Sequence, residues 1–294
     1  MYQTIEKFKL VLTISALCKL LKVSRTCYEK WVKKGKPEKY LDQDLVKKIK
    51  YYNEKYDYAG YRTFWKNIEK TKGVLYSLNK IKRHVQNSNI TIRYNKPKIY
   101  NNQIKNQNDK QTSEYLMNKI KSNITTSNVA WSIDITYLSS HKTRFYLVAI
   151  IDVHDKVIIA KKLCHTLEVK HIIEVVRKAY TQRNNPKGVV VNSDRGSQFT
   201  SFKYSNLMNS LGLVRSMNLP RTPTQNAWIE SFFCRLKFEL NVKSEFKNKG
   251  FYEISKIINK YIYYYNQYRK HSSLNYTTPY EKYSKSTIIN LHLI

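Results

Sequence analysis

Residues 189–201 read VVVNSDRGSQFTS, and residues 222–233 read TPTQNAWIESFF. The valines at 189–191 form the short β-branched run typical of a buried strand, and Gly196 breaks that strand soon afterwards. Asp194 therefore lies at the exit of a rigid element, where its side chain projects into a crevice rather than into the core. From 226 to 242, apolar residues recur at helical spacing, which predicts a helix with Glu230 on its other face. Thirty-five residues separate Asp194 from Glu230.

A third acid, Asp134, lies in the middle of a strand-like run, WSIDITYLSS. Acids are scarce in this chain of 294 residues, which has 21 Asp and Glu against 53 Lys and Arg and a formal charge of +32. A charge of that size indicates a polyanionic partner. Two strand acids and one helix acid in such a chain predict a carboxylate metal site that acts on phosphodiesters.

The chemistry of phosphodiester exchange explains why three carboxylates would gather. It needs a deprotonated nucleophile, a neutralised leaving oxygen and an offset charge on the phosphorus, and two divalent ions about 3.5–4 Å apart supply all three. Mg²⁺ (or Mn²⁺) takes hard oxygen ligands, usually one or two carboxylates per ion. We therefore expect two ions held by Asp134, Asp194 and Glu230. Taken singly, each acid is better explained as a strand, turn or surface residue, but their joint pattern favours catalysis.

Asp152 is the main competing candidate, because it also lies in a predicted strand. It lacks the convergence of strand and helix that such sites use. We place it, with Asp155, among the outward polar residues of a hairpin.

The order of the predicted elements defines the fold class. Three strands come first, then a helix, a strand, a helix, a strand and the Glu230 helix. This order, βββαβαβα, predicts an α/β fold with a ribonuclease-H-like mixed sheet and helices on its faces, preceded by all-α helix-turn-helix units. A Tyr-rich helix at 251–268 and an irregular basic tail are expected to follow.

The first half of the chain is predicted to contain two small helical units. Residues 1–36 outline a helix-turn-helix with Ser24 as N-cap, although an ordinary helical hairpin with a basic surface fits this stretch as well. Residues 40–90 outline a second such DNA-binding unit, and 91–122 form a basic linker that lies on phosphates or is a solvated tether. The catalytic core, with its C-terminal helix and tail, is expected over 123–285.

Several basic residues are candidate DNA contacts. Lys237 follows Glu230 by seven residues, so two turns of about 3.6 residues return it to nearly the same face. Its alternative is an ion pair with Glu239 or with Glu230 itself. The other candidates are Arg195, Arg25, Lys80, Lys82 and Arg83. His84 is expected at the surface or on a phosphate.

The four cysteines are Cys18, Cys27, Cys164 and Cys234, with no C-x-x-C pair and no zinc-type spacing to His. They are expected to be small core residues of a reduced, intracellular protein. No stretch reaches the roughly 18 apolar residues of a membrane span, and the N-terminus has no signal-peptide cleavage site. We expect a cytoplasmic, nucleoid-associated protein with no membrane partner.

The motif blocks resemble a known family. SIDITYL, NSDRGSQFTS and NAWIESFFCRLKFEL, with YNQYRKHSSLNYTTPYEKY behind them, are similar to the catalytic frame of bacterial transposases of the insertion-sequence-three family. This family is related to retroviral integrases and has an Asp-Asp-35-Glu signature, whose acids correspond here to Asp134, Asp194 and Glu230. KVSRTCYEKW and YAGYRTFWKNIEK match its helix-turn-helix portion, so the resemblance runs from about 17 to 283.

The chain departs from the family pattern at three places. Residues 152–156 replace an Asp-Phe-Ser-Arg-like turn, Gln225-Asn226 replaces Asp-Asn, and Asn192 replaces a His. A His-His-Cys-Cys zinc module is also absent from the sequence, which argues against a retroviral type of integrase. These departures concern loop positioning and target preference, and they leave the three acids in place.

The resemblance implies a DDE transposase that cleaves and joins DNA at the ends of its own insertion sequence. Its expected partners are the terminal inverted repeats, target DNA, further copies of the chain on DNA, and the upstream-frame protein of the same element. That last partner is expected because such catalytic frames are often fused to an upstream frame, and this frame starts with its own Met. The alternatives are a non-catalytic regulator that occupies the element ends and a structure-selective ribonuclease-H-like nuclease.

Overall fold

The computed structural model describes residues 1–35, 41–55, 60–72, 76–88, 90, 115–140, 143–219 and 222–291. The chain forms two compact units, 1–91 and 92–294, which are described separately. Within the described residues, no helix has the length and apolar character that crossing a membrane would require.

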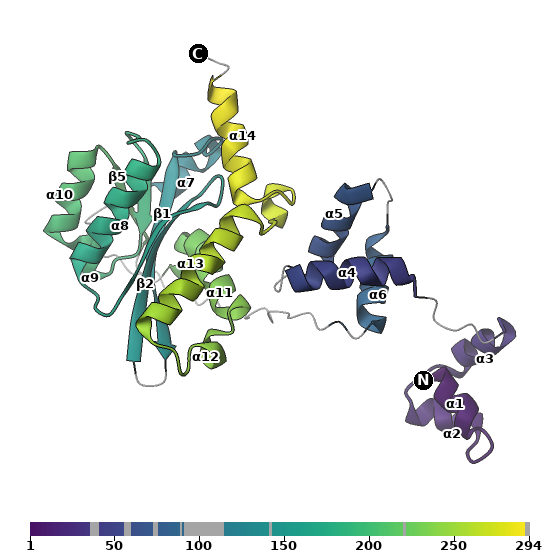
Figure 1. Ribbon diagram of the computed structural model, residues 1–294. Helices are drawn as coiled ribbons and strands as arrows, with labels where there is room; N and C mark the ends of the chain where they lie inside the picture. Colours follow the sequence, from purple (N-terminus) through teal and green to yellow (C-terminus); the bar gives the residue numbers. More distant parts are fainter. Residues whose placement is uncertain are drawn as a thin grey trace. The chain divides into compact units, whose positions relative to one another are not determined.

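The second unit is built on a five-stranded mixed sheet in the order β3-β2-β1-β4-β5 (Figure 1). β1 pairs antiparallel with β2, and β2 pairs antiparallel with β3, whereas β4 and β5 join in parallel. This is the predicted ribonuclease-H-like arrangement. The strands are β1 (Ala130–Ser140), β2 (Thr143–Asp152), β3 (Ile158–Cys164), β4 (Val190–Ser193) and β5 (Val214–Met217).

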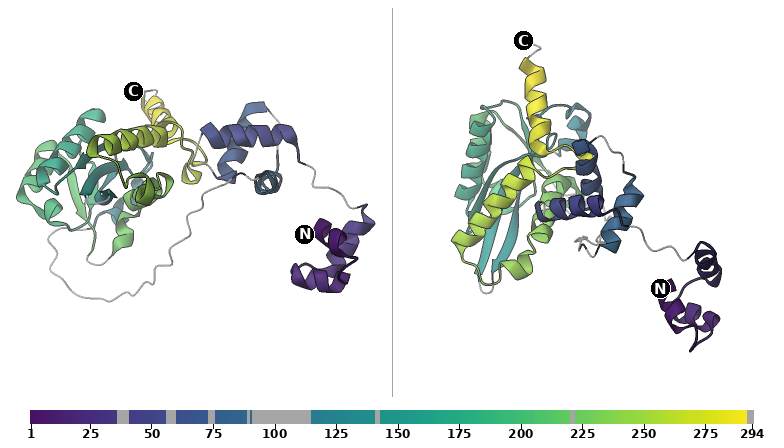
Figure 2. Two further views of the ribbon diagram at one scale, coloured as in Figure 1. Left: turned by 60° about the horizontal axis from the view of Figure 1, so that its bottom comes forward. Right: turned by 45° about the vertical axis from the view of Figure 1, so that its right-hand side comes forward.

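Helices cover both faces of the sheet (Figures 1 and 2). One face carries α8 (Val169–Gln182), α9 (Ser197–Thr200) and α10 (Phe202–Leu211). The other carries α11 (Ala227–Glu239), α12 (Val242–Glu245) and α13 (Phe251–Gln267). The remaining elements of this unit are α7 (Met117–Ile120), η1 (Lys121–Asn123), η2 (Pro223–Asn226), η3 (Ser272–Leu274) and α14 (Pro279–Leu291).

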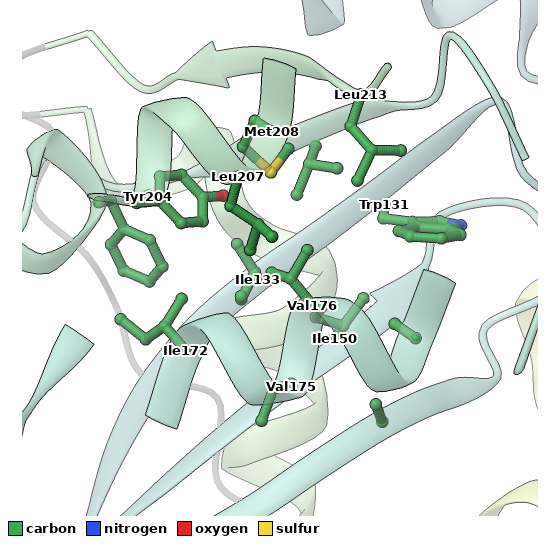
Figure 3. Close-up of a cluster of buried hydrophobic side chains, with 14 of the residues drawn as sticks. Trp131, Ile133, Ile150, Ile172, Val175, Val176, Tyr204, Leu207, Met208 and Leu213 are labelled. Carbon is green, nitrogen blue, oxygen red and sulfur yellow. The ribbon is translucent and has the colours of Figure 1, made fainter. Parts of the chain in front are cut away.

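Alternation along the strands decides which residues face which layer. Trp131 and Ile133 of β1, together with Val191 of β4, enter the main apolar core beneath α8 and α10 (Figure 3). Successive strand residues point to opposite faces. The intervening residues, among them Ser132, Asp134 and Asn192, therefore face the layer that contains α11.

The end of the predicted linker packs on the sheet. Met117 of α7 is 1% exposed and lies in a small core with Ala130, Val153 and Val190. The segment that begins at residue 115 thus belongs structurally to the catalytic unit. Residues 91–114 of the predicted linker lie outside the described residues.

The expectation of an irregular tail is wrong beyond residue 278. Thr278 and Glu281 form a reciprocal cap, in which the Glu281 N–H donates to Thr278 Oγ1 (3.1 Å) and the Thr278 N–H donates to Glu281 Oε2 (3.0 Å). Pro279 stands at the first helical position, where its missing N–H has no cost. These three residues begin α14.

The first unit consists of short helices with apolar clusters. α1 (Tyr2–Phe8), α2 (Ile14–Leu20) and α3 (Arg25–Lys33) enclose Ile5, Leu17, Cys18 and Tyr28. Ser24 caps α3 as predicted, with its Oγ 3.5 Å from the Cys27 nitrogen. α4 (Gln43–Lys55), α5 (Tyr61–Lys72) and α6 (Leu78–Asn87) bury Leu45, Ile49, Phe64, Ile68, Ile81 and Val85.

Candidate active site

The end of the pairing between β1 and β4 positions the two aspartates. These parallel strands pair only over Ala130–Ser132 and Val190–Asn192, and the last pair is Ser132 with Asn192. Asp134 follows Ser132 by two residues within β1, so the period of two turns it towards the same face as Ser132. Asp194 comes directly after Ser193, the last residue of β4, which is the strand exit predicted for it.

Backbone amides orient one oxygen of each aspartate. Asp134 Oδ1 accepts the N–H of Ile135 (2.7 Å), and Asp194 Oδ1 accepts the N–H of Gly196 (2.9 Å). A Cβ at position 196 would lie 3.1 Å from Asp194 Oδ1, so glycine lets the loop close over the carboxylate. These bonds engage Oδ1 of each aspartate and leave Oδ2 outside them.

Glu230 comes from α11, which packs against β1 and β2. The helix buries Ile229, Phe232, Phe233 and Leu236, and this apolar side fixes its rotation. Glu230 lies in the first turn, where the partial positive charge of the helix N-terminus favours a carboxylate.

The three acids lie within reach of one another's charge. Burial, together with the charges of Asp194 and Glu230, raises the pKa of Asp134 to about 7, against the opposing effect of the Ile135 N–H. Burial and the charge of Asp194 also raise the pKa of Glu230. Like charges gathered in this way are stabilised when a cation binds among them.

Lys237 belongs to the same site. It is half-buried on α11, and its charge lowers the pKa of Asp134. The seven-residue spacing therefore brings Lys237 near the strand acid, as the helical geometry predicts. Its alternative partner Glu239 is instead buried and bonded to Arg269 (2.7 Å) and to the Tyr261 hydroxyl (2.8 Å).

The donor set suits Mg²⁺ or Mn²⁺ in chemistry, since it consists only of carboxylate oxygens. The acids do not form a closed ligand cage, however. Among the residues that the structure describes, no group of three or more His, Cys, Asp or Glu side chains is close enough to hold a metal ion. The three acids thus lie near one another, at a wider spacing than coordination would need.

Sequence comparison identifies the family to which the second unit is similar. Residues 125–223 and 211–279 match two models of the integrase core domain. The chain is 30% identical over 155 residues to a transposase-like protein of Haemophilus influenzae, covering 53% of this chain and 70% of that protein. It is 33% identical over 163 residues to the transposase for insertion sequence element IS904 of Lactococcus lactis (54% and 64% covered). The transposase InsF for insertion sequence IS3A of Escherichia coli is 29% identical (49% and 50% covered).

The chain belongs to the insertion-sequence-three family of DDE transposases. Its match nevertheless spans only half to about two thirds of most of these relatives.

Solved structures of this class are also similar to the integrase core. The HTLV-2 integrase catalytic core domain in complex with magnesium has 18% identity and a TM-score of 0.43, covering 54% of this chain and 98% of that one. The catalytic domain of Mos1 mariner transposase has 10% identity and a TM-score of 0.42, covering 50% and 76%.

The remaining candidate DNA contacts have diverse surroundings in this chain. Arg195 donates from Nε to the carbonyl of Asn218 (2.7 Å). Arg25 is exposed and pairs with Glu29 (2.8 Å), whereas half-buried Lys80 binds Asp42 (3.1 Å). Lys82 and Arg83 are exposed on α6. Their contacts with DNA remain predictions.

Three expectations about other polar residues are wrong. Asp152 and Asp155 are fully buried rather than outward, because Arg183 enters from the end of α8 and binds Asp155 through both terminal nitrogens (2.9 and 3.2 Å). His84 is also fully buried, where its Nε2 accepts the Asp42 N–H (3.0 Å). Of the cysteines, Cys18 and Cys164 are buried as expected, but Cys27 and Cys234 are exposed.

Proposed function

We propose that the protein is a metal-dependent transposase that cleaves and joins DNA at the ends of its own insertion sequence. One observation carries the proposal: in a chain of this family, the charges of Asp194 and Glu230 raise the pKa of Asp134, and the charge of Asp194 raises the pKa of Glu230, so the three acids lie near one another. A net charge of +32 suits a DNA substrate.

The proposed roles follow from the positions of the side chains. Asp134, Asp194 and Glu230 would hold two Mg²⁺ or Mn²⁺ ions, which neutralise charge on the attacking and leaving oxygens when bound. The backbone N–H groups of Ile135 and Gly196 orient the two aspartates. Water would act as the nucleophile for cleavage, and the released 3′-hydroxyl would act as the nucleophile for joining. Lys237 would bind a phosphate beside the scissile bond.

A strand-transfer assay tests this function. The full chain would be incubated with DNA that carries the terminal inverted repeats flanking its gene, with target DNA, and with Mg²⁺ or EDTA. We expect Mg²⁺-dependent joined products at the repeat ends. Binding to the ends without cleavage at any Mg²⁺ concentration would favour the regulator, and cleavage without end preference or joining would favour the nuclease.

Lys237→Ala should lower strand transfer about tenfold, the equivalent of about 1.4 kcal/mol, since it removes a charged hydrogen bond to phosphate. Binding of the element ends should weaken, while the melting temperature should not fall. The matched control is Lys203→Ala, which removes an exposed lysine from α10. Equal strand transfer by Lys237→Ala and wild type at all salt concentrations would contradict the role of Lys237.

A fragment of residues 1–110 should bind element-end DNA, because it contains the first compact unit with its own apolar clusters. Neutralising Z phosphates makes log K fall with log salt at a slope of about −0.9Z, so affinity should drop steeply between 50 and about 200 mM salt. The measurement is fluorescence anisotropy with end and shuffled sequences. Equal affinities for both would leave only a helical unit with a basic surface.

The function also implies partners that remain proposals. Joining two element ends to a target requires more than one catalytic unit, so we expect further copies of the chain to assemble on DNA. An upstream-frame protein of the same element and association with the nucleoid are further expectations of this proposal.

A further inference from the structure

Each element that carries one of the three acids also carries a buried polar residue close by in sequence. Ser132 precedes Asp134 by two residues on β1, Asn192 precedes Asp194 by two after the β4 valines, and Asn226 precedes Glu230 by four at the start of α11. Ser132 and Asn192 are fully buried, and Asn226 is 1% exposed. Buried polar groups of this kind require hydrogen-bond partners.

Asn226 connects the helix to both strands. Its Nδ2 donates to the carbonyl of Ile133 (3.2 Å), next to Asp134 in the chain. Its Oδ1 accepts from the Ser132 hydroxyl and from Asn192 Nδ2 (3.3 Å). One amide group thus bonds β1 through two residues and β4 through a third.

This use of Asn226 is unusual for its position. Asparagine is among the preferred N-cap residues because its side chain accepts an N–H of the first helical turn. Asn226 is the N-cap of α11, yet its side chain makes no capping bond. The Asn226 side chain bonds the two strands instead of the first turn of the helix.

Asn192 extends the connections to the neighbouring loop. Its Nδ2 also lies 2.9 Å from Asn218 Oδ1 and 3.2 Å from the carbonyl of Gln225. Its Oδ1 accepts the hydroxyl of Ser216 on β5 (2.9 Å). The segment that leads from β5 into α11 is therefore tied to the residue that precedes Ser193-Asp194.

Backbone pairing between strands cannot fix the position of Glu230 relative to Asp134 and Asp194. The β1–β4 ladder ends at Ser132 and Asn192, before either aspartate, and a strand ladder makes no bond to α11. Apolar packing of α11 tolerates small shifts along the sheet, whereas hydrogen bonds to a single amide are directional. A displacement of about 1 Å in a catalytic group can cost about 10²-fold in rate.

We propose that Asn226, with Ser132 and Asn192, is the positioning network that sets Glu230 relative to Asp134 and Asp194. These residues do not touch substrate in this role; they act through the carboxylates. The inference rests on the proposed function, because it assigns the network to the site that would bind metal ions and DNA.

The chain provides a matched control. Asn266 on α13 also bonds a strand through both ends of its amide, since its Nδ2 donates to the Ile158 carbonyl (3.0 Å) and its Oδ1 accepts the Ile158 N–H (3.0 Å). Asn266→Ala removes a side chain of the same type from the same unit, but one that bonds β3, which carries none of the three acids. Ser132→Ala is a milder variant of the network, in which a single hydroxyl is lost.

The test compares Asn226→Ala, Asn266→Ala and Ser132→Ala in the full chain at a temperature where all remain folded. With saturating DNA, we expect Asn226→Ala to lower the strand-transfer rate constant about 10²-fold. Its Kd for DNA should stay within about twofold of wild type, because the residues of the network are buried. Asn266→Ala should keep the rate within about threefold. Ser132→Ala should lower the strand-transfer rate constant about tenfold. This variant tests the positioning role if Asn226→Ala does not fold.

A second readout does not depend on activity. Mn²⁺ should raise the melting temperature of the DNA-free wild type and of Asn266→Ala, and this rise should be reduced in Asn226→Ala and Ser132→Ala. Equal loss of rate in Asn226→Ala and Asn266→Ala, or an unchanged Mn²⁺ response in both network variants, would overturn the positioning role. A wild-type chain that never joins DNA would instead overturn the proposed function, and the Mn²⁺ response would still decide the positioning role.

Discussion

Asp134→Asn, Asp194→Asn and Glu230→Gln should each reduce cleavage and joining of DNA by at least about 10³-fold. An amide is nearly the same size as the carboxylate, but it supplies neither the charge nor both oxygens that a divalent ion requires. Loss of this electrostatic stabilisation is worth several kcal/mol, and about 1.4 kcal/mol corresponds to each factor of ten. The measurement is strand transfer with Mg²⁺ and with Mn²⁺, accompanied by DNA binding.

DNA affinity should remain close to wild type in all three variants, because the first unit and the basic surface are unchanged. Glu174→Gln is the matched control, since it neutralises an exposed acid of α8 in the same unit. It should retain full activity. Mg²⁺-dependent joining by any one of the triad variants would remove that residue from the catalytic set.

Asp155→Ala should lower the free energy of unfolding by about 3–5 kcal/mol, because it leaves the Arg183 guanidinium buried without its counter-charge. The side chains of Arg183 and Asp155 are 3% and 0% exposed. For a unit of this size, that loss corresponds to a fall in melting temperature of about 6–20 °C. Differential scanning calorimetry of the full chain measures it.

The control for the buried pair is an exposed one. Lys162 and Glu174 also form an ion pair, but the Glu174 side chain is 54% exposed. Such a pair contributes about 0–1 kcal/mol, so Glu174→Ala should change the melting temperature little. Similar melting temperatures for Asp155→Ala and Glu174→Ala would show that Arg183 finds another partner or reaches water.

Local patterns were sufficient to predict the sheet and the face of the sheet on which Asp134 lies. The alternation in β1 places Trp131 and Ile133 in one layer, so Asp134 must face the other. The spacing between Glu230 and Lys237 needs only the helical period, and the structure brings Lys237 near Asp134. These predictions depend on one element at a time.

Contacts between distant residues could not be predicted in this way. The burial of Asp155 depends on Arg183, which lies 28 residues further along, and the burial of His84 depends on the Asp42 N–H, 42 residues away. The Thr278–Glu281 cap was missed although it could have been predicted, because a Thr-Pro-x-Glu pattern is a helix-start signal that can be recognised in the sequence. The polar residues Ser132, Asn192 and Asn226 show their common purpose only when the three elements come together.

The order of elements along the chain has a consequence for synthesis on the ribosome. Residues 1–91 form the first compact unit, whereas Glu230 emerges 139 residues after residue 91. At about 5–20 residues per second, this interval lasts about 7–28 s. During that interval the nascent polypeptide already contains its first folded unit but lacks the last of the three acids. With the DNA binding proposed for residues 1–110, a product that terminates prematurely before α11 would occupy DNA without cutting it.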